Sequence, residues 1–364
     1  MSASFDPASL IRPAVATLQP YTPILPFEVL SARLGIPAAD IIKLDANENP
    51  YGPSPRAVEA VAHFPHMHIY PDPESGQLRQ ALGEYTGLSP DYLLVGHGAD
   101  ELIDLLMRLF ISPGDSIINC PPTFGMYPFD AAVNGARVVN VFRRADFSLN
   151  LPAIQAALER VPRPKLLFIA TPNNPDGLPL AEATLQRLLK LPLVVILDEA
   201  YVEFCGHSFI RRVAEHPNLV VLRTFSKWAG LAGLRVGYGA FPPPIINQLW
   251  KIKQPYNVNV AGQAAALASL NDRAYLQQNV AKIIAARDAF AQELAHIPWL
   301  RPYPSRANFI LARVAGKEAA AVKDALARQG ILRHYRSARL QDHLRVSIGT
   351  PAHMARLLKG LHAL

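Results

Sequence analysis

The chain has 364 residues, half of them hydrophobic and 18% charged, which indicates a packed globular protein and excludes a disordered one. The net charge of +7 favours anionic ligands, but the 36 lysines and arginines are scattered, so no nucleic-acid partner is expected. Two cysteines, Cys120 and Cys205, are too few for a disulfide framework, and the chain start lacks signal-peptide features, so we expect a cytoplasmic protein. The longest apolar runs are far shorter than the ~20 residues that span a bilayer, so no membrane partner is expected.

Short apolar runs alternate with helical patterns over the middle of the chain. Seven such runs occupy residues 93–98, 116–120, 136–142, 166–172, 193–201, 219–226 and 235–241. Several are continuous rather than alternating, which is typical of strands buried on both faces. A helical pattern over residues 99–110 follows the first run and ends at "SPGD". This order predicts an α/β domain with a mostly parallel seven-stranded sheet.

The pattern changes after about residue 255. Helices are predicted over residues 279–297 and 317–329, and strands over 307–314 and 343–350. We therefore expect an N-terminal arm with a small-domain segment (1–46), a large domain (47–255) and a smaller α+β C-terminal domain (256–364). The proline-rich stretch 13–26 is expected to run extended over the surface.

Two polar turns follow predicted strands, at the place where α/β sheets bind ligands. "GHGADE" (96–101) opens a helix and presents free backbone N–H groups to an anion such as phosphate. "ATPNNPDG" (170–177) is a rigid polar loop with two asparagines between prolines. Taken singly, the first also fits an ordinary strand–helix turn and the second an ordinary proline–asparagine turn.

Asp198 and Lys227 follow two further apolar strands. A carboxylate in that position must be paired or hydrogen-bonded, and Asp198 alone would also fit a metal-binding pair with Glu199. Lys227 alone would also fit a salt-bridged lysine at a strand end. Together, a phosphate-binding turn, a carboxylate, an asparagine and a lysine are what pyridoxal phosphate requires, because lysine bonds it covalently and a carboxylate keeps its ring nitrogen protonated.

Seven motifs occur in a fixed order along the chain: "LDANENPYGPSP", "YPDPESGQLRQAL", "GHGADELIDLL", "PPTFGMY", "TPNNPDG", "LDEAYVEF" and "TFSKWAGLAGLRVGYG". They resemble those of the histidinol-phosphate aminotransferases, within the fold-type-I pyridoxal-phosphate enzymes, and the resemblance extends from about residue 20 to "LRVSIGT" near 350. It implies a pyridoxal 5′-phosphate cofactor, a homodimer, and transfer of an amino group between L-histidinol phosphate and 2-oxoglutarate. The products would be imidazole-acetol phosphate and L-glutamate, in histidine biosynthesis.

The resemblance also implies roles for individual residues. Lys227 would hold the cofactor and later move a proton, Asp198 would pair with the ring nitrogen, and Tyr201 would contribute to catalysis. The other cofactor contacts would be Asn174, with Tyr201, at the ring 3-oxygen, Phe124 on the ring face, and Ala99, Asp100, Thr224, Ser226, Arg235 and the partner subunit's Tyr70 at the phosphate. The substrate would bind at Arg345, with Arg333, Tyr21 and Asn47 as neighbours.

Two positions depart from the family pattern and are candidates for tuning substrate choice. Asp176 stands where threonine or serine is usual, and Trp228 directly follows the lysine. The histidines of "HFPHMH" (63–68) have no carboxylate or cysteine set to complete a metal shell, so no metal site is expected.

Three other functions are alternatives to the predicted histidinol-phosphate aminotransferase activity. A threonine-phosphate decarboxylase and an aromatic amino-acid aminotransferase would use the same cofactor site, and the motifs do not separate them from the histidinol-phosphate activity. A cofactor-sensing regulator would need an added DNA-binding domain, and the residues before Asn47 are too few and too rich in proline to supply one.

Overall fold

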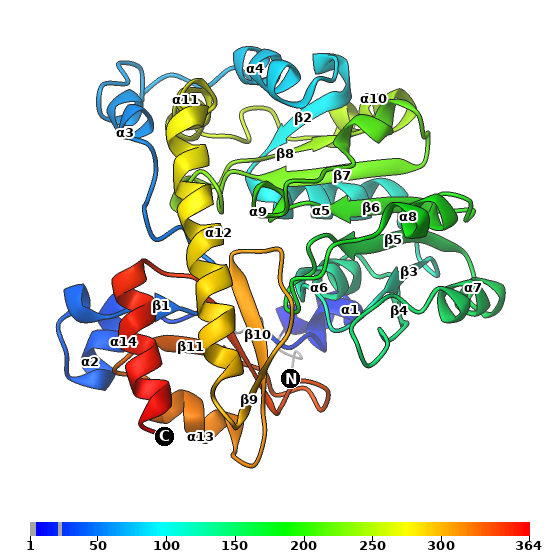
Figure 1. The fold of residues 1–364 in the computed structure, drawn as a ribbon. Helices are drawn as coiled ribbons and strands as arrows, with labels where there is room; N and C mark the ends of the chain where they lie inside the picture. Colours follow the sequence, from blue (N-terminus) through cyan, green and yellow to red (C-terminus); the bar gives the residue numbers. More distant parts are fainter. Residues whose placement is uncertain (1–4, 21–23) are drawn as a thin grey trace.

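The computed structural model describes residues 5–20 and 24–364, which form two sheets with their covering helices (Figure 1). The larger sheet has seven strands in the order β2 (Leu93–Gly96), β8 (Gly237–Ala240), β7 (Leu219–Thr224), β6 (Val194–Asp198), β5 (Pro164–Ala170), β3 (Ser116–Asn119) and β4 (Arg137–Asn140). β8 runs opposite to the other six strands of this sheet, which all point the same way. The predicted mostly parallel seven-stranded sheet is confirmed.

Both faces of this sheet are buried, because side chains alternate between two apolar layers. In β7, Val220 and Leu222 face one layer, while Leu219 and Val221 face the other. The first layer is covered by α5 (Gly98–Phe110), α6 (Met126–Val133) and α10 (Pro243–Ile252). The second is covered mainly by α4 (Gly76–Thr86), α7 (Leu151–Arg160), α8 (Glu182–Leu188) and η4 (Ile210–Ala214).

The smaller sheet has the strand order β1 (Lys43–Leu44), β11 (Ile331–His334), β12 (His343–Ser347), β10 (Phe309–Val314) and β9 (Leu300–Pro302). Its helices are α2 (Phe27–Leu34), α13 (Ala319–Ala325) and α14 (Pro351–His362). The long helix α12 (Arg273–Ala295) reaches this sheet from α11 (Val260–Asn271), which packs on α3 (Pro55–Ala62) and α4 beside the large sheet (Figure 1). The domain limits at 46/47 and 255/256 stay a prediction.

The proline-rich stretch 13–26 begins with a helical turn, so the prediction of an extended chain was wrong for residues 13–16. Short helical segments form at η1 (Pro7–Leu10) and α1 (Pro13–Ala16), and α2 starts directly after Pro26. Proline at a helix start loses nothing, because the N–H it lacks would have no partner there. The remaining short segments are η2 (Ala38–Asp40), η3 (Pro90–Tyr92), α9 (Val202–Cys205) and η5 (Ala232–Leu234).

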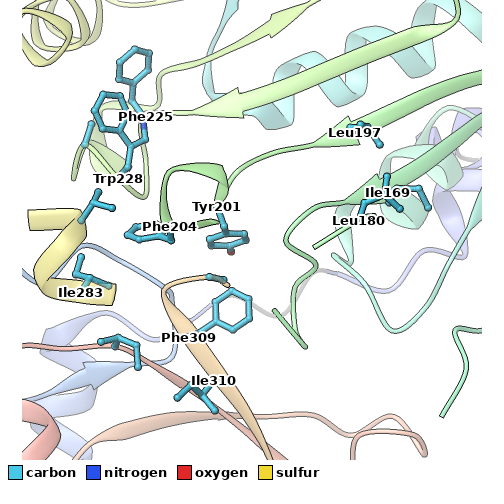
Figure 2. Packing of buried hydrophobic residues seen from close by; sticks show 14 of the residues in the cluster. Ile169, Leu180, Leu197, Tyr201, Phe204, Phe225, Trp228, Ile283, Phe309 and Ile310 are labelled. Atoms are coloured by element: carbon cyan, nitrogen blue, oxygen red, sulfur yellow. The ribbon is translucent and has the colours of Figure 1, made fainter. Parts of the chain in front are cut away.

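Aromatic side chains form the packed seam between the two sheets. The Tyr201 ring meets the Phe309 ring edge-on, with centroids 5.1 Å apart, and Phe204 and Ile283 lie on the same seam (Figure 2). Trp228 is 2% exposed and stacks on Tyr85 at 5.6 Å. The residue after Lys227 therefore anchors its backbone in the core. Among the described residues, no helix combines the length and apolarity needed to cross a bilayer.

Candidate active site

The ends of β5, β6 and β7 and the start of α5 surround one cavity, because the carboxyl ends of parallel strands share one edge of a sheet. The cavity has a volume of about 140 Å³. Its lining residues are Ala99, Asp100, Phe124, Ala170, Asn174, Asp198, Ala200, Tyr201, Thr224, Ser226, Lys227, Ala232 and Arg235. Every predicted cofactor-site residue except Tyr70 is in this set.

Asp198 ends β6 with its carboxylate 5% exposed and both oxygens hydrogen-bonded. Its Oδ2 accepts a 2.6 Å bond from the Tyr127 hydroxyl, and its Oδ1 accepts a 3.0 Å bond from the Ala200 N–H. Burial raises the pKa of Asp198 to about 6, although both bonds oppose that rise. The carboxylate is therefore a held anion near neutral pH, able to pair with a protonated ring nitrogen.

Lys227 follows β7 and extends toward the small sheet. Its Nζ donates a 3.0 Å hydrogen bond to the carbonyl of Ala46, which lies in the loop after β1 and directly precedes Asn47. Burial, assisted by the positive charge of Arg345, lowers the pKa of Lys227 to about 8. A lysine in this state is readily deprotonated to a nucleophilic amine.

The other end of the cavity is built to hold an anion. The first N–H groups of the 13-residue helix α5 lie there, and Thr224 and Ser226 place two hydroxyls 2.9 Å apart. Arg235 enters from a left-handed backbone conformation (φ 53°), and its Nη2 lies 2.8 Å from Asp100 Oδ2.

Glycines keep this end of the cavity open. A Cβ at Gly98, where φ is +76°, would lie 2.5 Å from Nη2 of Arg235, and one at Gly237 would lie 2.4 Å from the Ala99 nitrogen. The backbone N–H groups, two hydroxyls and a guanidinium fit the phosphate group of pyridoxal phosphate, and Lys227 and Asp198 fit its ring. The residues present therefore match this cofactor.

A larger cleft of about 530 Å³ adjoins the cavity and shares Phe124, Asn174, Tyr201 and Lys227 with it. Arg333 and Arg345 line this cleft directly opposite each other on β11 and β12. Like charges in that arrangement repel, so an anion between them would stabilise the pair. Nε of Arg345 is also buried without a hydrogen-bond partner in residues 5–20 and 24–364.

Asn47 joins the two halves of the site. It has a left-handed backbone (φ 55°), and its Nδ2 donates a 3.0 Å bond to the Tyr201 hydroxyl. Its Oδ1 accepts a 2.8 Å bond from the Ser347 hydroxyl on β12. Burial raises the pKa of Tyr201 to about 12, so this phenol stays protonated.

Some predicted positions are not part of this cavity. Tyr70 is 79% exposed and stacks on Tyr256 at 4.7 Å, away from its own chain's cavity. Tyr21 lies outside the described residues. No group of three or more His, Cys, Asp or Glu side chains in the described part of the chain is arranged to hold a metal ion.

Tyr127 is the functional residue that the sequence prediction missed. It is fully buried on α6, three positions after Phe124, and it donates the shortest bond to Asp198. The available signal was its place in "PPTFGMY", a polar and aromatic motif that continues directly into a helix.

Comparison with known proteins agrees with this geometry. The family "Aminotransferase class I and II" matches residues 39–361. A chloroplastic histidinol-phosphate aminotransferase of Nicotiana plumbaginifolia is 54% identical over 356 residues, covering 97% of this chain and 86% of the relative. A histidinol-phosphate aminotransferase of Roseiflexus castenholzii is 53% identical over 351 residues, 94% of each chain.

A solved structure has the same fold. The histidinol-phosphate aminotransferase of Sinorhizobium meliloti, in complex with pyridoxal-5′-phosphate, superposes with a TM-score of 0.87 over 98% of each chain, at 30% identity. The chain is thus a pyridoxal-phosphate-dependent transaminase of class I and II. Within that class it belongs to the histidinol-phosphate aminotransferase family.

Proposed function

We propose that this enzyme transfers the amino group of L-histidinol phosphate to 2-oxoglutarate, the reaction of histidine biosynthesis that gives imidazole-acetol phosphate and L-glutamate. The observation that carries the proposal is the cavity in which Lys227, Asp198 and the α5 N-terminus meet beside two facing arginines. When bound, pyridoxal phosphate supplies an electron-withdrawing ring that delocalises negative charge from the substrate carbon.

The chain's own residues would orient and protonate around that ring. Lys227 would attach the cofactor, and its Nζ would also carry a proton to and from the substrate carbon. Of the residues that line the cavity, Asp198 would hold the proton on the ring nitrogen, Asn174 and Tyr201 would donate to the ring 3-oxygen, and Phe124 would cover one ring face. The cofactor phosphate would be held by Ala99, Asp100, Thr224, Ser226 and Arg235.

Arg345 and Arg333 would recognise the acidic end of both substrates. A planar guanidinium forms two parallel hydrogen bonds to a phosphate or to a carboxylate, so one site can serve the donor and the acceptor in turn. Asn47 lines the same cleft and orients Tyr201. Tyr21 is proposed as a further substrate neighbour from the family resemblance alone.

We further propose a homodimer in which the partner subunit's Tyr70 completes the phosphate site. Support comes from the exposure of the apolar side chains that surround this position in the sequence, Met67 at 60%, Ile69 at 53% and Tyr70 at 79%. A cytoplasmic location is proposed because both cysteines are free, as expected in a reducing compartment.

The covalent role of Lys227 is tested by Lys227→Ala. This variant should lose the visible absorbance of lysine-bound cofactor and nearly all turnover, because the nucleophile and the proton carrier vanish together. Lys190→Ala, which removes an exposed lysine, is the matched control and should keep both. A normal cofactor spectrum in Lys227→Ala would refute the assignment.

A further inference from the structure

Asp176 is a fully buried carboxylate that does not line the cofactor cavity. It lies in the loop after β5, and both of its oxygens accept hydrogen bonds, Oδ1 from the Leu178 N–H at 2.9 Å and Oδ2 from Nδ2 of Asn173. Burying a carboxylate costs free energy, and burial raises the pKa of Asp176 to about 6 although the charge of Arg143 opposes the rise. The free-energy cost of burying the Asp176 carboxylate indicates that this side chain has a specific role.

Asn173 connects Asp176 to a second loop, the one after β3. Its Nδ2 also donates a 3.1 Å bond to the carbonyl of Pro122, and its Oδ1 accepts a 2.8 Å bond from the Thr123 hydroxyl. An ionised carboxylate is an acceptor only, so it fixes which end of the Asn173 amide faces it. Asp176 and the Pro122 carbonyl together hold the NH2 group and thereby direct the amide oxygen to Thr123.

The hydrogen bonds that run from Asp176 through Asn173 to Thr123, here called the relay, join two loops. Each loop carries one side chain of the proposed cofactor site. Thr123 directly precedes Phe124, and Asn173 directly precedes Asn174. Phe124 and Asn174 line the cavity, one proposed for the ring face and the other for the ring 3-oxygen. The relay therefore sets the distance and angle between two groups that hold the same ring.

We propose that Asp176 is a positioning residue for the cofactor, which acts through Asn173 and Thr123 to hold Phe124 and Asn174 in register. Small displacements of positioned groups have large kinetic effects. Arg143 is not a hydrogen-bond partner of Asp176 in this relay: its Nε and Nη1 donate to the carbonyls of Cys120 and Phe147, and its Nη2 has no partner among the described residues. The inference rests on the proposed cofactor site.

The test compares Asp176→Asn, Thr123→Val and the double variant, each saturated with pyridoxal phosphate. Asp176→Asn keeps only one acceptor oxygen, so either the Asn173 amide or the Leu178 N–H loses its acceptor. We expect kcat to fall about tenfold in each single variant, consistent with the loss of one buried hydrogen bond, with little change in KM. The visible circular dichroism per bound cofactor, which reports ring orientation, should change in both.

The double variant and a matched control separate positioning from general stability. If one relay connects the two residues, adding Thr123→Val to Asp176→Asn should cost little further activity, whereas independent residues would multiply their losses. Asp146 accepts a 3.0 Å bond from the Ser148 N–H in a similar turn but is exposed, so Asp146→Asn should leave kcat and circular dichroism unchanged.

Three outcomes would overturn the inference: unchanged circular dichroism and kcat in Asp176→Asn, multiplied losses in the double variant, or equal losses in Asp146→Asn. Should Asp176→Asn fail to fold, Thr123→Val carries the test, and normal circular dichroism with normal kcat in that variant refutes the relay. Failure of the proposed function is distinguishable, because it would appear in the unaltered enzyme as a missing lysine-bound cofactor spectrum or as poor turnover of L-histidinol phosphate relative to other donors.

Discussion

Arg345 and Asn174 join the two sheets across the active site: Nη1 of Arg345, on β12, donates a 2.6 Å hydrogen bond to Oδ1 of Asn174, in the loop after β5. The bond fixes the Asn174 amide and leaves its Nδ2 available for the proposed bond to the cofactor. Nη2 of Arg345 donates a second 2.6 Å bond to the carbonyl of Asp45. The side chain proposed to bind the substrate's acidic end is therefore held by the cofactor site itself.

Replacing Arg345 with lysine should weaken both substrates together. Lysine keeps the positive charge but loses the planar pair of donors, so kcat/KM for histidinol phosphate and for 2-oxoglutarate should each fall by about tenfold to a hundredfold. The lysine-bound cofactor spectrum should remain. Steady-state kinetics of both half-reactions checks this, and a loss for one substrate alone would contradict a shared anion site.

The pKa of Lys227 predicts how cofactor capture depends on pH. Burial and the nearby Arg345 charge lower this pKa to about 8, and only the neutral amine attacks, so capture by the apoenzyme should accelerate as pH rises through about 8. Arg345→Gln removes a positive charge and raises the pKa, so the midpoint should move to higher pH. Stopped-flow absorbance across a pH series measures both midpoints; identical midpoints would show that Arg345 has no influence.

Asp198→Ala should keep the covalent cofactor but lower turnover by about a hundredfold or more, because nothing then holds the proton on the ring nitrogen. Near-normal turnover with the cofactor bound would rule out this role for Asp198.

Tyr127→Phe tests whether the ionisation of Asp198 controls turnover. Its hydroxyl lowers the pKa of Asp198, so removing it raises that pKa and should shift the acidic limb of the kcat–pH profile to higher pH. An unmoved acidic limb would exclude Asp198 as the group responsible.

The sequence alone was sufficient to place the candidate cofactor-binding residues on one edge of the sheet. Continuous apolar runs marked buried parallel strands, and the polar residues directly after them had to meet where those strands end. Asn174, Asp198 and Lys227 were found in this way. The ends of the strands could be predicted because they depend on residues that are close together in the sequence.

Contacts between separate layers could not be predicted in the same way. Tyr127 and Asp198 are 71 residues apart, and Arg345 and Asn174 are 171 apart, so both bonds depend on how helices and sheets pack together. The residues next to Asn47 form no sequence pattern that predicts its left-handed backbone conformation. The prediction of an extended N-terminal stretch was wrong at Pro13 because proline fits the start of a helix as well as an extended chain.

Shared active sites are tested by mixing two inactive variants. Lys227→Ala subunits lack the cofactor lysine, and Tyr70→Ala subunits lack the side chain proposed to cross the interface. Mixed dimers should regain one intact site per dimer, and therefore part of the activity, after the two proteins are unfolded and refolded together. If each site is complete within one chain, the mixture will show only the sum of the two separate activities.

The comparison of amino donors tests the central claim most directly. With 2-oxoglutarate as acceptor, kcat/KM should be highest for L-histidinol phosphate and lower by about a hundredfold for unphosphorylated L-histidinol, which lacks the charge-assisted bonds to Arg345. L-Phenylalanine should be a poor donor, and threonine phosphate should release no carbon dioxide. A phenylalanine kcat/KM equal to that of histidinol phosphate would contradict the account in favour of an aromatic aminotransferase. Carbon dioxide released from threonine phosphate would contradict it in favour of a decarboxylase.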